Sequence, residues 1–164
     1  MTVAALYVQQ GGVYSSLPGV VAYDVKADAR NYAGPWPVVA HPPCRAWGKF
    51  RHVAKPRDGE RELAFHALEM VMRYGGVLEH PVGSQFFAAA RIPRSDLVRV
   101  NQVDWGHRAI KSTYLLLVGC TMPAVLPQPG VPVTTVERLC RQERERTPRA
   151  FAEFLVGLAR SASV

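Results

Sequence analysis

The sequence has few cysteines, and this shortage excludes a disulfide-stapled scaffold. Only Cys44, Cys120 and Cys140 occur among 164 residues, and their spacing forms no pairing framework. An odd and sparse count is typical of a reducing compartment, where thiols serve chemistry or packing. We therefore expect free thiols and a cytoplasmic location.

The sequence also has no apolar stretch suited to a membrane or to export. Its longest segment without a charged residue, 112–136, is interrupted by four prolines, which a membrane helix does not tolerate in such number. The N-terminus lacks the basic region and the small-residue cleavage pattern of a secretory signal. We expect no membrane association.

The sequence also has fewer acidic residues than basic ones. The sequence has 13 of them against 20 lysines and arginines, which gives a net charge of +7. This excess favours a polyanionic partner, with nucleic acid first. Hydrophobic residues make up 48% of the chain, which excludes disorder and suits one globular domain over residues 1–164.

Short apolar runs separated by turn residues predict a sheet. Residues 3–8, 20–23, 38–40 and 77–79 have the length and the β-branched content of buried strands. Between the last two, residues 60–74 carry apolar side chains at helical spacing and end at a glycine pair. This pattern predicts a β-α-β unit, whose two parallel strands end at one edge of the sheet.

The second half of the chain predicts a different strand arrangement. Residues 97–103 and 113–118 are joined by a polar turn, which favours an antiparallel pair. Thr147 as N-cap and Pro148 at the first helical position predict a terminal helix with one apolar face. The fold we expect is α/β, with a minimal Rossmann-like sheet that is mostly parallel and ends in an antiparallel hairpin.

A candidate nucleophile follows the strand 38–40. Cys44 lies in the segment His41-Pro42-Pro43-Cys44, where the two prolines stiffen the loop. Arg45, and His41 if it is protonated, would favour the thiolate that a nucleophilic cysteine needs. The alternative is a small buried apolar residue in a proline-stiffened turn.

A candidate acid follows the predicted helix. Glu79 ends the strand 77–79, so we expect it on the same sheet edge as Cys44. A partly buried glutamate there has a raised pKa and stays protonated to donate to a ring nitrogen. The alternative is a charge that caps the next turn.

Two basic segments offer contacts to nucleic acid. One is the loop after Cys44, which combines charge with aromatic stacking surface. The other is the turn 105–111, which suits phosphate contact, although a solvated hairpin tip is the simpler alternative. The residues concerned are Arg45, Trp47, Lys49, Phe50, Arg51, His52, Lys55 and Arg57 in the loop and His107, Arg108 and Lys111 in the turn.

These motifs occur in an order found in a known enzyme family. Pro42-Pro43-Cys44 follows one strand, Val77-Leu78-Glu79-His80-Pro81 forms the next, Gly106 and Arg108 precede a later strand, and Thr147 opens the last helix. In this order the chain resembles a compressed, methyltransferase-like relative of the cytosine-C5 DNA methyltransferases. It is also similar to small bacterial and phage-encoded proteins that share the AHPPC, GGVLEHP and WGHRA layout.

The resemblance implies a pyrimidine-modifying enzyme with a covalent mechanism. Cys44 would add to C6 of the base while Glu79 acts at N3. Arg108 belongs to the basic motif of the family, and together with Lys111 it would hold the flanking phosphates. In duplex DNA the target base would have to be flipped out of the stack.

The resemblance also implies a methyl donor, S-adenosylmethionine, at the ends of the first strands. Gly11 and Gly12 stand where the family has its glycine-rich motif, and Asp24 ends the second strand, where acidic residues accept a ribose hydroxyl. The large target-recognition region of the family is reduced here to the short segment 119–147. The substrates we expect are therefore DNA, single-stranded DNA included, or a pyrimidine nucleotide.

Two other classes of function fit the same residues. In the first, the chain is a catalytically inactive nucleic-acid-binding module, in which Cys44 and Glu79 only pack. In the second, His41 and Cys44 join His80 or His107 to bind zinc, since each residue type is an ordinary zinc ligand. Spacing alone supports no metal site, because no second close ligand pair exists.

Overall fold

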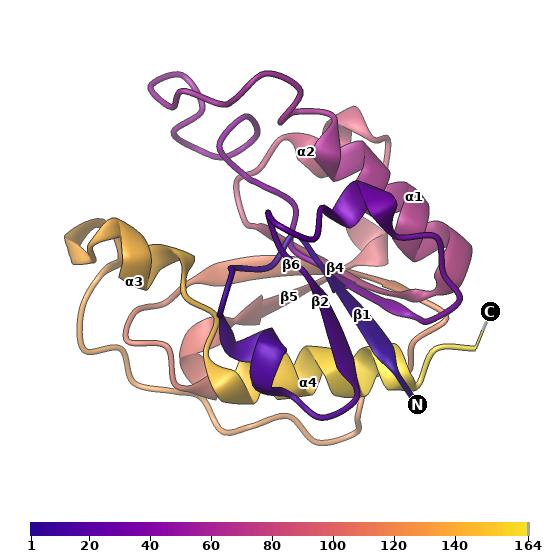
Figure 1. Cartoon of the computed structure of the whole chain (residues 1–164). Coiled ribbons are helices and arrows are strands. Elements are labelled where there is room, and N and C mark those ends of the chain that lie inside the picture. The colour runs from indigo at the N-terminus through magenta and orange to yellow at the C-terminus, as the bar shows by residue number, and fades with distance from the viewer. Residues whose placement is uncertain (164) are drawn as a thin grey trace.

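A computed structural model describes residues 1–163 of the chain as a six-stranded sheet with the strand order β2-β1-β3-β4-β6-β5 (Figure 1). The pairs β1–β2, β1–β3 and β3–β4 are parallel, and β6 runs antiparallel to both β4 and β5. The predicted α/β fold, with a mostly parallel sheet and an antiparallel pair, is confirmed. The strands are β1 (Val3–Leu6), β2 (Val20–Tyr23), β3 (Val38–Ala40), β4 (Gly76–Pro81), β5 (Leu97–Asn101) and β6 (Ser112–Val118).

Helices cover both faces of the sheet. Figure 1 shows α1 and α2 on one side of the strands and α4 on the other. No helix among residues 1–163 is long and apolar enough to cross a membrane. The helices are α1 (Leu63–Tyr74), α2 (Phe86–Ala89), α3 (Arg141–Glu145) and α4 (Arg149–Arg160), and the short 3-10 turns are η1 (Val13–Ser16), η2 (Ala29–Asn31), η3 (Arg94–Asp96), η4 (Gln102–Trp105) and η5 (Val136–Arg138).

Strand periodicity divides the core into two clusters. In β1, Ala4 and Leu6 pack with α1, whereas Val3 and Ala5 pack with α4. Successive side chains of a strand point to opposite faces, so a strand buried on both sides reads as a continuous apolar run. The same alternation continues along β4 and sends Glu79 and His80 to opposite faces of the sheet.

The two long helices begin later than their sequence patterns predict. Residues 60–62 precede α1 rather than belonging to it, because Glu60 is buried in an ion pair with Arg45. The N-cap of α4 is Pro148 and not Thr147, and no side chain caps this helix. The apolar face of α4 is nevertheless buried against the sheet, and its packing positions the helix.

The crossover from α1 into β4 requires a glycine. Gly75 ends α1 with a φ of 71°, and Gly76 enters β4 with a φ of 123°. A Cβ atom on Gly76 would lie 1.9 Å from the carbonyl oxygen of Val38 in the neighbouring strand. Only the absence of a side chain lets β3 and β4 pair at this point.

We predict that Gly76→Ala destabilises the protein by about 3 kcal/mol or more, since the added methyl group overlaps backbone that cannot move without breaking the β3–β4 pairing. Gly83 is a matched control, because its φ of 89° is also positive but a Cβ there meets nothing within 4 Å. Gly83→Ala should cost only about 1–2 kcal/mol, the price of the left-handed backbone. Urea unfolding of both variants measures the difference, and equal losses would contradict this explanation.

Candidate functional site

Cys44 lies in a tight turn just beyond β3 and is exposed to solvent. Its carbonyl oxygen accepts hydrogen bonds from the backbone N–H groups of Trp47 at 3.0 Å and Gly48 at 2.7 Å. These bonds and the two preceding prolines fix the turn. The alternative interpretation, in which Cys44 is a buried packing residue, is wrong.

The surroundings of Cys44 favour the thiol over the thiolate. Desolvation raises the pKa of its sulfur, the negative charge of Glu79 raises it further, and Lys111 opposes both effects. The expectation that Arg45 and His41 activate the thiol is wrong. The guanidinium of Arg45 is committed to Glu60, and the ring of His41 is committed to Glu79.

Glu79 is a buried carboxylate with three hydrogen-bond donors. His41 Nδ1 lies 3.0 Å from Oε2, while the hydroxyl of Thr113 and, at 3.4 Å, the amide of Gln102 donate to Oε1. Burial raises the pKa of Glu79, but the donors and the nearby Lys111 overcome this effect and lower the pKa to about 2. The prediction of a raised pKa and a protonated acid is therefore wrong, since Glu79 is ionised at neutral pH.

Tyr14 extends this arrangement into the core. Its hydroxyl lies 2.6 Å from His41 Nε2, so Tyr14, His41 and Glu79 form one hydrogen-bonded chain. Sequence reasoning singled out His41 and Glu79 but missed Tyr14, Gln102 and Thr113. The three missed residues come from η1, η4 and β6, and no local spacing pattern links them.

The structure brings Cys44, Glu79 and Lys111 together at the carboxyl edge of the parallel strands. They are close enough for Glu79 and Lys111 to shift the pKa of Cys44 in opposite directions. Lys111 is half-buried and forms no ion pair with any carboxylate in residues 1–163. The edge therefore presents a thiol, a carboxylate and an uncommitted ammonium group.

His80, beside Glu79 in β4, faces the opposite side of the sheet. It is fully buried against the rings of Phe86 and Phe87. Neither ring nitrogen has a hydrogen-bond partner within the described part of the chain, and desolvation lowers the pKa of His80 to about 4. His80 is thus a neutral core residue at physiological pH.

The basic loop after Cys44 contains residues with two different roles. Arg45 forms a two-bond ion pair with the buried Glu60, at 2.9 and 2.6 Å. Trp47 is 1% exposed and lies beneath the guanidinium of Arg61, so the predicted stacking of nucleic-acid bases on Trp47 is wrong. Phe50 is the exposed aromatic ring of this loop, with Lys49 Nζ 5.7 Å from its centre.

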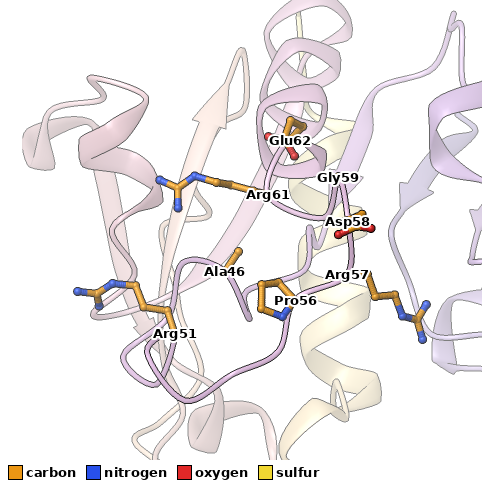
Figure 2. Close-up of a pocket in the computed structure, with 8 residues that line it drawn as sticks. All are labelled: Ala46, Arg51, Pro56, Arg57, Asp58, Gly59, Arg61 and Glu62. Carbon is orange, nitrogen blue, oxygen red and sulfur yellow. The ribbon is translucent and has the colours of Figure 1, made fainter.

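Four further basic residues of the loop are exposed: Lys49, Arg51, Lys55 and Arg57. Arg51 and Arg57 line a cavity of about 460 Å³, together with Ala46, Pro56, Asp58, Gly59, Arg61 and Glu62. In Figure 2, Arg51 and Arg61 extend to the same side of the loop, whereas Arg57 extends to the other. The guanidinium groups therefore spread over the surface of the loop and do not converge on one point.

The turn 105–111 offers fewer side chains for phosphate contact than its composition predicts. His107 is buried, and its Nδ1 is bonded to the backbone of Ala109, so its predicted contact with phosphate is wrong. Arg108 is exposed, but it forms an ion pair with Glu143 of α3. Lys111 is the residue of this turn that reaches the edge occupied by Cys44.

A second cavity, of about 340 Å³, opens at the ends of β1 and β2. Its lining includes Tyr7, Asp24, Asp28 and Pro43, but neither Gly11 nor Gly12. Tyr7 and Asp28 have φ angles of 60° and 53°, a strained conformation for residues other than glycine that is concentrated at functional sites. This cavity shares Pro43 with the loop that carries Cys44.

Asp24, which the sequence analysis placed in the cofactor site, lies in the lining of this cavity. Its Oδ1 accepts the backbone N–H groups of Lys26 at 2.8 Å and Ala27 at 2.9 Å. These bonds lower its pKa and keep the group ionised. Oδ2 remains free for a hydroxyl group of a ligand.

Residues 1–163 contain no group of three or more histidine, cysteine, aspartate or glutamate side chains that could hold a metal ion. Both ring nitrogens of His41 are occupied, His80 faces the other side of the sheet, and His107 is bonded to its own turn. The zinc hypothesis therefore has no ligand set here.

Comparison with known proteins finds little. No family model matches this chain, and no curated protein matches it. Among solved structures, one neighbour is a prophage-encoded protein of E. coli assigned as a DNA modification methyltransferase, with a TM-score of 0.45 and 14% sequence identity. The alignment covers 83% of this chain and 53% of that one, so the chain spans about half the length of this neighbour.

We predict that the protein loses stability as the pH falls from 6.5 to 4. The folded-state pKa of His80, about 4, lies below the ordinary histidine value of 6.5, so the unfolded chain binds more protons in this interval. The difference amounts to about 3 kcal/mol of unfolding free energy. His80→Leu should remove this dependence in urea titrations at several pH values.

Glu79→Gln is the control, because the stability that the depressed pKa of Glu79 contributes is lost only at lower pH, between about 4.5 and 2. This variant should keep the slope between pH 6.5 and 4. An unchanged slope in His80→Leu would contradict the assignment to His80.

Proposed function

We propose that the chain is a methyltransferase-like enzyme that modifies a pyrimidine at C5, in DNA or in a nucleotide, with Cys44 as the nucleophile. The observation that supports this most is the exposed thiol of Cys44 beside the ionised Glu79 at the carboxyl edge of a parallel sheet. Ligands of open α/β folds bind at this edge. A carboxylate held by three donors beside an exposed thiol is a costly arrangement that packing alone does not require.

The proposed chemistry begins with the thiol. As the Cys44 Sγ–C6 bond forms, the thiol proton passes to a water molecule and the electrons of the C5–C6 double bond move onto C5 and the adjoining ring carbonyl. C5 then carries the electron density and becomes nucleophilic. Lys111, which favours the ionised form of Cys44, lowers the cost of reaching the thiolate. C5 would then bond to the electrophilic carbon of the methyl donor as the bond from that carbon to its leaving group breaks. A water molecule would take the C5 proton, and the freed electrons would re-form the C5–C6 double bond as the Sγ–C6 bond breaks and releases the cysteine thiolate.

We place the proposed cofactor, which contains a ribose, in the cavity of about 340 Å³ at the ends of β1 and β2. S-adenosylmethionine would supply an electrophilic methyl carbon when bound. Asp24, with a free carboxylate oxygen, would hold its ribose, and Tyr7 and Asp28 would wall its site. Gly11 and Gly12 lie outside this lining, so the proposed binding relies on Asp24 instead of a glycine-rich turn.

The exposed part of the basic loop is the proposed contact to nucleic acid. Lys49, Arg51 and Lys55 supply positive charge, and Phe50 supplies a ring on which a base can stack. This combination suits single strands, because every base has a face that stacks. Lys111 would contact a phosphate near the thiol.

A catalytically inactive binding module is the second candidate. The raised pKa of Cys44 and the three donors already on Glu79 favour it, because neither group is poised for chemistry in the free protein. In this case the basic loop would bind nucleic acid, and Cys44 and Glu79 at the carboxyl edge of the sheet would catalyse no reaction.

We predict that DNA from cells expressing the protein contains a modified pyrimidine nucleoside that mass spectrometry detects. Cys44→Ala should abolish it, since the Sγ–C6 bond cannot form. Cys140→Ser is the matched control, because Cys140 is also exposed but lies outside the site, and it should leave the yield unchanged. Identical nucleoside profiles for wild type and Cys44→Ala would favour the binding module.

We also predict that the protein binds single-stranded DNA with an affinity that falls steeply with salt, because lysine and arginine displace counterions from phosphate. Phe50→Ala should weaken binding on the order of tenfold through lost stacking. Lys49→Ala should reduce the salt slope by about one, whereas Lys26→Ala, an exposed lysine of the β2–η2 turn, should not. Fluorescence anisotropy measures all three, and salt-independent binding would exclude nucleic acid as the partner.

A further inference from the structure

The Tyr14–His41–Glu79 chain is assembled from segments that lie far apart in the sequence. Tyr14 belongs to η1, His41 to the loop after β3 and Glu79 to β4, while η4 and β6 add Gln102 and Thr113. Tyr14, Gln102 and Thr113 are at most 3% exposed, and the side chains of Glu79 and His41 are 10% and 14% exposed. Buried polar groups from five elements are thus bonded into one network, in which the amide oxygen of Gln102 has no hydrogen-bond partner within residues 1–163.

The hydrogen bonds assign protons along this chain. Glu79 is ionised, so it only accepts, and His41 must carry a hydrogen at Nδ1 to donate to it. Burial raises the pKa of Tyr14 well above its ordinary value, so the phenol keeps its proton and can donate it to His41 Nε2. With the phenol as donor, His41 carries a hydrogen at Nδ1, toward Glu79, and accepts at Nε2, from Tyr14.

The count of acceptor sites limits what else Glu79 can bind. A carboxylate has about four lone-pair sites. Three of them are occupied by the donors His41, Thr113 and Gln102. One site remains, and the 10% exposure of this side chain places part of it within reach of a ligand.

We propose that Tyr14 and His41 are positioning residues that hold Glu79 as an acceptor for a single N–H group on the substrate ring. This inference rests on the proposed function, and it narrows the substrate to a pyrimidine whose N3 carries a hydrogen. A uracil-type ring has this hydrogen already, whereas cytosine must be protonated at N3. Glu79 cannot supply that proton, because it has none at neutral pH.

The charge of Glu79 depends on all the groups that face it. His41 and Lys111 stabilise its negative charge, and that charge in turn raises the pKa values of Tyr14 and Cys44. It also favours protonation of His80 across the sheet, although desolvation is the stronger effect there. Among these groups, His41 is the one bonded directly to the carboxylate.

The experiment is a pH titration of the Glu79 carboxyl carbon by NMR in protein labelled with ¹³C-glutamate, with the resonance assigned by Glu79→Gln. In wild type we expect no titration between pH 8 and 4. In His41→Ala the midpoint should rise by at least one pH unit, because burial is no longer opposed by the ring N–H. His41→Asn restores a donor near the position of Nδ1 and should return the midpoint toward that of wild type.

A second measurement covers the case in which His41→Ala does not fold. In wild type, ¹⁵N spectra of His41 should show only the Nδ1–H tautomer, and Tyr14→Phe should give a mixture of tautomers. A single unchanged tautomer in Tyr14→Phe would overturn the role of Tyr14. An unchanged Glu79 midpoint in folded His41→Ala, or a folded His41→Asn that does not restore it, would overturn the role of His41.

These titrations need no substrate, so they separate this inference from the proposed function. The expected shifts without any modified pyrimidine in DNA or in the nucleotide pool would leave the positioning roles intact and refute the enzyme. A modified nucleoside that requires Cys44, together with a Glu79 midpoint that does not change in His41→Ala, would support the enzyme and overturn the positioning roles.

Discussion

The ionised carboxylate of Glu79 is the constraint on which the site depends. A negative charge at the buried end of β4 is unfavourable unless hydrogen bonds and a nearby cation compensate for the lost water. The compensation comes from His41, Thr113 and Gln102, with Lys111 close by. The loop after β3, the turn η4 and the strand β6 must all be in place for the charge to be tolerated. The site and the fold at this edge are therefore stabilised together.

The negative charge of Glu79 also affects the ionisation of Cys44. A thiol beside a carboxylate resists ionisation, and desolvation adds to this resistance. Lys111 acts in the opposite direction, so the balance at the sulfur depends on the positions of two charged side chains. A substrate that donates a hydrogen bond to Glu79 or brings a phosphate to Lys111 changes this balance. Binding and activation of the thiol are thus coupled by electrostatics.

Periodicity predicted the elements that carry the site. The apolar runs of β1, β3 and β4 and the helical spacing in α1 were sufficient to place Cys44 and Glu79 after neighbouring parallel strands. The boundary of α1 was less predictable, because Glu60 is withdrawn from the helix by its ion pair with Arg45. That pairing joins residues 15 apart along the chain, and local propensity contains no information about it.

The partners of Glu79 could not be predicted for the same reason. Tyr14, Gln102 and Thr113 reach the carboxylate only through the packing of η1, η4 and β6 around β4, which is a property of the whole fold. For Trp47 the sequence predicted a functional role that the structure does not support, since a tryptophan among basic residues suggested a surface on which bases stack. Its Nε1 donates to the carbonyl of Arg61, and the ring packs on Phe65 and Phe86, so it anchors the loop from within.

The central claim, that Cys44 attacks C6 of a pyrimidine, is tested most directly by trapping the adduct. A single-stranded oligonucleotide containing 5-fluorouracil keeps the N3 hydrogen that Glu79 would accept. Its fluorine cannot be lost in place of the C5 proton, so the thiol adduct formed in the presence of S-adenosylmethionine survives denaturation and is resolved on a gel. The account predicts a shifted band for wild type whose crosslinked peptide contains Cys44, and no such band for Cys44→Ser. An adduct on Cys140, or no adduct although the oligonucleotide binds, would contradict it.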